Sequence, residues 1–184
     1  MYKRERGLSL IEAAMVLALA TIFISGVLYY YQIAKENENR DEIMSTTMNI
    51  VATVNKLYAN YGFHKSYTGL SNELIQKAIP SLKLNDNGMI IQPNGITIDV
   101  WPWQQNGGYV YVISIDHIPT SQCENYSTML TSVGGNLIKK AWIGGSHQDW
   151  YPFNGNPEEV RKQLFAACHG ITQDTTLISV ALNT

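Results

Sequence analysis

The feature that most constrains this chain is an apolar run near its N-terminus. The 26 residues from Leu8 to Ile33 carry a single charge, that of Glu12, and the 19 residues from Ala13 to Tyr31 carry none. As a helix rising ~1.5 Å per residue, such a run is long enough to cross a hydrocarbon core of ~30 Å. The run therefore predicts a membrane-spanning helix over residues 8–33.

Charged residues on either side of the run predict its orientation. Residues 1–7 (MYKRERG) hold three bases and one acid, whereas residues 35–42 (KENENRDE) hold four acids and two bases. By the positive-inside rule the N-terminus stays in the cytoplasm and residues 34–184 are exported. A cleavable secretory signal is disfavoured, because the apolar core is too long and three tyrosines and Gln32 replace the small residues of a cleavage site. A plain single-pass anchor fits the length and leaves Glu12 unexplained.

Glu12 is the costly residue of this segment. An acidic side chain within an apolar span costs a few kcal/mol on insertion scales, unless it reaches the headgroups or pairs with a cation. Cleavage between Gly7 and Leu8 would create such a cation, the α-amino group of Leu8, one helical turn from Glu12. The amine of a neighbouring subunit, offset along the axis, would meet Glu12 in the same way.

The order of these residues carries a family resemblance. Gly7-Leu8-Ser9-Leu10-Ile11-Glu12, followed by AAMVLALA, resembles the class III signal sequence of type IV pilins, and most closely that of the type IVb subgroup. The resemblance implies that residues 1–7 are a leader removed by a prepilin peptidase, which also N-methylates Leu8. It also implies that Glu12 sets the register of each subunit during polymerisation by the pilus assembly machinery.

Two features depart from the pattern of the family. The leader of seven residues is short for the type IVb subgroup. In addition, no proline interrupts Leu8–Gly62, whereas many type IVa pilins carry one in the apolar half of this helix.

Beyond Gln32 the helical pattern continues in amphipathic form. Apolar residues recur at helical spacing from Ile43 to Tyr61, so residues 34–61 are expected to pack against a globular region. One helix from Leu8 to about Tyr61 would be roughly 80 Å long. Gly26 is the expected place for bending or partial melting, because glycine costs up to ~1 kcal/mol within a helix.

Residues 62–184 predict an α+β region on this helical spine, the fold class that the pilin resemblance also implies. Leu70–Ala78 is a predicted helix stopped by Pro80, and a second helix opens with a Ser121–Glu124 capping box and ends near Val133. A third helix begins at Asn156-Pro157 and ends near Cys168. The predicted strands are Met89–Gln92, Ile96–Trp101, Tyr109–Asp116, Leu137–Ile143 and Thr176–Leu182, with a hairpin loop at Gln104–Gly108.

The two cysteines of the chain both lie in the exported part, where thiols are oxidised. Cys123 and Cys168 allow one intrachain pairing, which would close a loop of about 45 residues and contribute roughly 4 kcal/mol in the entropic model. Region 123–168 is similar to the disulfide-bounded D-region of type IV pilins. A metal site is disfavoured, because the cysteine spacing is far from that of a zinc motif.

The sequence holds little that indicates catalysis. The four histidines are scattered singly, and Ser146-His147-Gln148-Asp149 places triad-type residues next to each other, where they rarely form a triad. No glycine-rich phosphate loop is present, and we expect no cofactor. The aromatic residues Trp101, Trp103, Trp142, Trp150 and Tyr151 are candidates for an exposed ligand site, although core packing is the commoner use of aromatic side chains.

Charge excludes one large class of partner. Charged residues make up 15% of the chain, the formal net charge is −2, and removal of residues 1–7 would change it to −4. Because no basic excess exists to neutralise phosphates, binding of nucleic acid is disfavoured.

Together these observations predict a non-enzymatic subunit of a homo-oligomeric helical filament. It would be stored in the bacterial inner membrane with its N-terminus inside and would become extracellular on assembly, serving adhesion, aggregation or mating contact. A minor pilin and a secretion-system pseudopilin remain open within the family. A signal-anchored periplasmic enzyme or binding protein is the alternative from another class.

Overall fold

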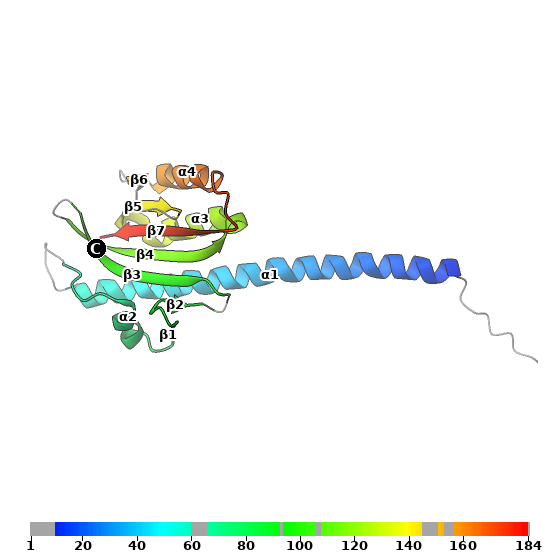
Figure 1. Ribbon diagram of the computed structural model, residues 1–184, viewed down its shortest axis with the longest axis horizontal. Coiled ribbons are helices and arrows are strands. Elements are labelled where there is room, and N and C mark those ends of the chain that lie inside the picture. The colour runs from blue at the N-terminus through cyan, green and yellow to red at the C-terminus, as the bar shows by residue number, and fades with distance from the viewer. Residues whose placement is uncertain are drawn as a thin grey trace, which may run out of the picture. The chain divides into compact units, whose positions relative to one another are not determined.

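The computed structural model describes residues 10–59, 66–92, 94–105, 108–144, 151–152 and 157–183 (Figure 1). The chain divides into two compact units, Met1–Arg40 and Asp41–Thr184. We call the second unit the head. Helix α1, Leu10–Tyr58, contributes residues to both units.

In the first unit α1 is helical without interruption, including Gly26. Residue 26 is therefore not melted in this structure. The polar side chains beside it keep their bonds within the helix, since Thr21 Oγ1 donates to Leu17 O at 2.8 Å and Ser25 Oγ donates to Ile22 O at 2.9 Å. Such back-bonding gives the hydroxyls partners without any neighbour. The predicted helix ends at Leu8 and Tyr61 lie outside the described residues.

The head is built on a sheet whose described strands number seven, in the order β1-β2-β3-β4-β7-β5-β6. Every neighbouring pair is antiparallel. Figure 1 shows the long central strands β3, β4 and β7 side by side. The strands are β1 (Lys83–Leu84), β2 (Ile90–Ile91), β3 (Thr97–Gln105), β4 (Gly108–Pro119), β5 (Ile138–Ile143), β6 (Tyr151–Pro152) and β7 (Thr175–Leu182).

Three further α-helices of the described chain lie in the head: α2 (Asn72–Ala78), α3 (Cys123–Gly134) and α4 (Pro157–Cys168). Short 3-10 turns, Thr120–Gln122 and Gly135–Leu137, flank α3. Ser71 caps α2 by accepting a hydrogen bond from the Leu74 N–H at 3.3 Å. Gly134 must be glycine, because a Cβ there would lie 2.3 Å from Ile138 Cγ1.

One apolar core joins these elements. The buried face of α1 within the head carries Ile43, Ile50, Val54 and Tyr58, and it belongs to the same cluster as alternate residues of the strands and the inner faces of α3 and α4. On β4 the alternate residues Tyr111, Ile113 and Ile115 are all buried in this core, which the period of two of a strand explains. Packing was expected over residues 34–61, and the buried residues of α1 run from Ile43 to Tyr58.

The expected α+β fold is confirmed, with corrections at element ends. The hairpin loop is shorter than predicted, because β3 and β4 stay paired out to Gln105 and Gly108. Pro102 is accommodated in β3 because β2 pairs only with Thr97 and Ile98 in the described chain, so β3 has a single partner at Pro102.

The capping box predicted at Ser121 and Glu124 is wrong. Helix α3 begins at Cys123, and its N-cap residue, Gln122, makes no side-chain cap bond. The reason lies elsewhere in the chain: Thr120 donates its N–H to Asp174 O at 3.0 Å and its hydroxyl to Gln173 O at 2.5 Å. These long-range bonds hold the segment before α3 as a 3-10 turn, so Ser121 does not reach a capping position.

Candidate functional site

The apolar part of α1 is the most unusual surface of the described chain. Leu10 is 88% exposed, Phe23 73% and Tyr30 74%, and every large apolar residue between them is also more than half exposed. Among the described residues, α1 alone is long and apolar enough to cross a membrane. Because soluble monomers rarely leave an apolar patch of this size in water, this surface requires lipid or protein around it. We call residues 10–33 of α1 the apolar segment.

Glu12 lies in the first turn of α1, at one end of the apolar segment. Its carboxylate is exposed there, and the described part of the segment holds no other charged residue. A carboxylate in a first helical turn is favoured by the helix dipole and by the unsatisfied backbone N–H groups. Gly7 and Leu8, the predicted cleavage and methylation residues, lie outside the described residues.

Cys123 and Cys168 are joined by a disulfide, the pairing expected from the sequence. Their Cα atoms lie 5.8 Å apart, and the bond links the start of α3 to the end of α4. Both cysteines are buried. The bridge therefore fixes two helices of the core, as a structural disulfide does, and holds no exposed thiol for redox chemistry.

The aromatic residues proposed as a ligand site are divided by the structure. The strand register places Trp101, Trp103 and Trp142 on the face of the sheet opposite the core. Trp142 is buried, while Trp101 and Trp103 are half-buried. Trp150 and the side chain of Tyr151 lie outside the described residues. The predicted set of five is therefore not brought together within the described chain.

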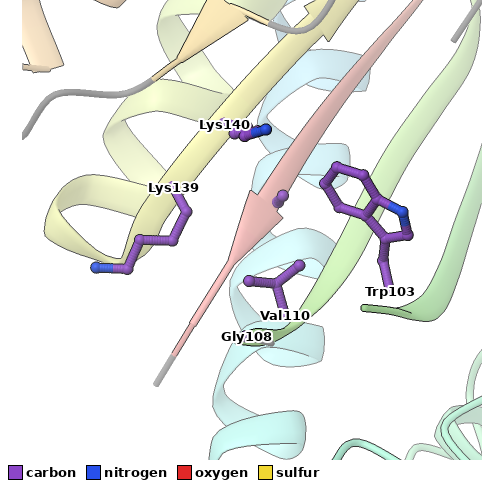
Figure 2. Close-up of a pocket in the computed structure, with 6 residues that line it drawn as sticks. Trp103, Gly108, Val110, Lys139 and Lys140 are labelled. Atoms are coloured by element: carbon purple, nitrogen blue, oxygen red, sulfur yellow. The ribbon is translucent and has the colours of Figure 1, made fainter. Parts of the chain in front are cut away.

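A small hollow of about 170 Å³ lies on this outer face (Figure 2). The Lys140 ammonium lies 5.6 Å from the centre of the Trp103 ring across it, a cation–π distance. Lys139 lies at its rim and is exposed. The hollow is lined by Trp103, Gly108, Val110, Lys139, Lys140 and Ala181. The adjacent lysines at the start of β5 were visible in the sequence, but the register that sets them beside Trp103 was not.

Two buried polar groups were also missed. Asn72 Nδ2 donates to Gly88 O and to Asp99 Oδ1, while Asn72 Oδ1 accepts from the Val100 N–H at 2.9 Å. The side chain thereby ties α2 to β3. Burial, reinforced by the neighbouring Tyr67, raises the pKa of Tyr111 far above its ordinary value. Neither role had a sequence signal, because each depends on residues brought together by the fold.

The two histidines of the described residues lie singly, each beside one acid. No group of three His, Cys, Asp or Glu side chains is arranged there to hold a metal ion. His169 contacts Glu124 at 3.1 Å and His117 contacts Asp116 at 3.7 Å, both at exposed positions. His64 and the Ser146–Asp149 segment lie outside the described residues.

Known proteins supply the remaining comparison. No family model matches the chain. Two curated proteins do: each is named the major structural subunit of bundle-forming pilus, one from Escherichia coli O127:H6 and one from Escherichia coli O111:H-. Each is 34% identical to this chain over 130 residues, covering 69% of this chain and 66% of the relative. The match thus spans about two thirds of the length of these relatives.

Proposed function

The chain belongs to the type IV pilin family, in its type IVb subgroup, and we propose that it is a structural subunit of an extracellular filament. The proposed role is mechanical and not enzymatic. It is supported by the relatives, whose names describe a major structural subunit of a pilus. The match covers about two thirds of those relatives, so the assembly steps below are inferred for this chain from its own residues.

The observation that carries the proposal is the exposed apolar segment of α1. Residues of this kind are stable in a bilayer before assembly and in a bundle of identical helices after it. We place the subunit first in the inner membrane, with residues 1–7 in the cytoplasm, and later in the filament core. Transfer from lipid to bundle gains little apolar burial, because lipid is as apolar as the bundle. Packing and polar pairing must therefore select the register.

Glu12 supplies that polar pairing in our proposal. A prepilin peptidase cuts between Gly7 and Leu8 and methylates the new amine, and the Leu8 amine of a neighbouring copy pairs with the Glu12 carboxylate. A subunit in another register would leave both charges unpaired in a medium of low dielectric, which is strongly unfavourable. The contact is head-to-tail, so it propagates as an open helical filament.

The first test is the chemistry of the mature N-terminus. Mass spectrometry of filament subunits is expected to find methylated Leu8 as the first residue. An intact Met1 on a monomer that is active as an enzyme or binding protein would refute the proposal. The number of copies per length of sheared filament then separates a major subunit from a minor pilin or a pseudopilin.

The second test addresses Glu12 itself. We expect Glu12→Ala to leave membrane insertion unchanged and to abolish or strongly reduce the filament yield. Glu42→Ala is the matched control, because Glu42 is an exposed acid on the same helix outside the apolar segment. Equal filament yields from the two variants would contradict the register role of Glu12.

A further inference from the structure

We infer that the two ends of the head form a complementary electrostatic contact between successive copies in the filament. This inference rests on the proposed function, because it needs copies of the chain stacked in one direction. We call Lys56, Lys139 and Lys140 the basic end, and Asp116, Glu124 and Asp174 the acidic end.

The basic end is located by the strand register and by an aromatic row. Lys140 pairs with Ala181 on β7, and Ala181 pairs with Val112 near the start of β4. Lys139 is the adjacent residue at the bulge in β5. These lysines therefore lie level with Tyr111 and Val112, in the first half of β4, with β7 between the two strands.

Contacts between three tyrosine rings place Lys56 at the same end of the head. It is two residues from Tyr58, whose ring centre lies 5.2 Å from that of Tyr67. The Tyr67 ring in turn lies 5.0 Å from that of Tyr111, again near the start of β4. The last turn of α1 and the start of β5 thus approach one end of the head, and Lys56 and Lys139 are both exposed.

The acidic end lies where β4 finishes. Asp116 is in the β-bulge near the end of β4, and Pro119 at the end of β4 pairs with Thr175, which follows Asp174. Asp174 O also accepts the Thr120 N–H at 3.0 Å. Glu124 is in the first turn of α3, just beyond. Along β4, Asp116 is four residues beyond Val112 and Pro119 is seven residues beyond it, which corresponds to about 13 Å and about 23 Å of extended strand.

Other charged residues near the two ends do not reverse the sign of the charge at either end. His117 contacts Asp116 at 3.7 Å, and His169 contacts Glu124 at 3.1 Å. Lys83 lies at the edge of the sheet, three strands away from Asp116. At the start of α4, Glu158 and Glu159 are matched by Arg161 and Lys162, and Arg161 pairs with Glu158 at 2.6 Å.

Each end of the head also has a hollow in its surface. At the basic end Lys139 stands at the rim of the hollow that contains Trp103 and Lys140 (Figure 2). At the acidic end an open hollow of about 500 Å³ is lined by Thr120, Ser121, Glu124, Asn125, Cys168 and His169. A lysine side chain of one copy fits a hollow of this size, where Glu124 supplies the opposite charge.

The sign of the charges favours a second copy in one orientation. A two-fold symmetric contact through either end would place like charges against each other, which costs free energy. A head-to-tail contact places the basic end of one copy on the acidic end of the next and can repeat without limit. The polarity of the head therefore favours stacking of copies in one direction.

The test reverses the charges at one end, then at both. We expect Lys139→Glu with Lys140→Glu to lower the yield of sheared filaments at least about tenfold, since like charges would then meet in every contact. Glu124→Lys with Asp174→Lys should do the same. The quadruple variant restores opposite signs and is expected to recover most of the yield.

The control variant changes the net charge by the same amount as the basic-end variant, but at two lysines outside the basic end. Lys77→Glu with Lys83→Glu alters two exposed lysines of α2 and β1 and should leave the filament yield near that of the wild type. The amount of membrane-inserted subunit with its disulfide formed is measured for every variant, so that a folding defect is recognised and the yield is expressed per folded subunit.

Two results would overturn the inference: a basic-end variant that assembles as well as this control, or a quadruple variant that folds and still fails to assemble. Failure of the proposed function looks different, because the wild-type chain itself would then form no filament and would retain residues 1–7.

Discussion

The apolar segment of α1 and the core of the head bury apolar side chains in opposite ways. In the head, Ile113, Ile115 and Val180 are at most 1% exposed, each covered by other parts of the same chain. In the apolar segment, Ile22 and Val27 are each 67% exposed. The head is thus stabilised by its own sequence, whereas the segment needs lipid or protein around it. Under the proposed function, this division allows the chain to be stored as a monomer and to polymerise without unfolding of the head.

The largest effect on the head should come from its disulfide. Cys123→Ser with Cys168→Ser opens a loop spanning 45 residues, and we expect the free energy of unfolding to fall by about 4 kcal/mol. Tryptophan fluorescence of the full chain in detergent measures this, because all four tryptophans lie within residues 41–184. The helicity of the apolar segment should not change. A loss below ~1 kcal/mol would show that packing alone fixes α3 against α4.

The same substitution in both regions tests the comparison directly. Ile113→Ala in the core is expected to lower the stability of the head by about 3 kcal/mol, from lost apolar burial and the cavity left behind. Ile22→Ala in the apolar segment should leave unfolding of the head unchanged, because Ile22 has no part in its core. Denaturant unfolding in detergent measures both. An equal loss of unfolding free energy from the two variants would contradict the division between a self-stabilised head and an apolar segment outside its core.

The contrast also explains what the sequence could and could not predict. The apolar segment was readable because its signal is local: a long uncharged run interrupted by Glu12. The long strands β3 and β4 were also anticipated, since the residues of Ile96–Trp101 and Tyr109–Asp116 alternate. The two-residue strand β1 was missed because it is too short to show any period.

Errors in the head arose where distant residues decide local structure. Ser121 and Glu124 have the spacing of a capping box, yet Thr120 is held by bonds to residues 53 and 54 positions away, which moves the start of α3. The sequence gives no reason to expect different burial for Trp142 and Trp103. Their burial differs because different strands flank them in the sheet. The basic and acidic ends needed the register of β4, β5 and β7, which no single segment encodes.

A smaller effect is expected where α2 joins the sheet. Asn72→Ala should destabilise the head by about 2 kcal/mol, because it leaves the buried Val100 N–H without its acceptor at 2.9 Å. Asn87→Ala is a milder control on the exposed turn nearby. Hydrogen exchange is the measurement, with faster exchange expected at Val100 and through α2. Unchanged exchange at Val100 would show that another group accepts this N–H.

The smallest effect concerns Tyr111 and has the opposite sign. Its hydroxyl is buried and makes no hydrogen bond in the described structure, so Tyr111→Phe should be neutral or stabilising by up to ~1 kcal/mol.

Burial raises the pKa of Tyr111 above its unfolded value of 10.0, with a further contribution from Tyr67. The folded state therefore holds this proton more tightly, and the stability of the head is full below pH ~10 and falls as the pH rises further. Tyr111→Phe should shift alkaline unfolding to higher pH, which a pH titration of the circular dichroism signal measures. A clear loss of stability in Tyr111→Phe at neutral pH would mean that the core uses this hydroxyl.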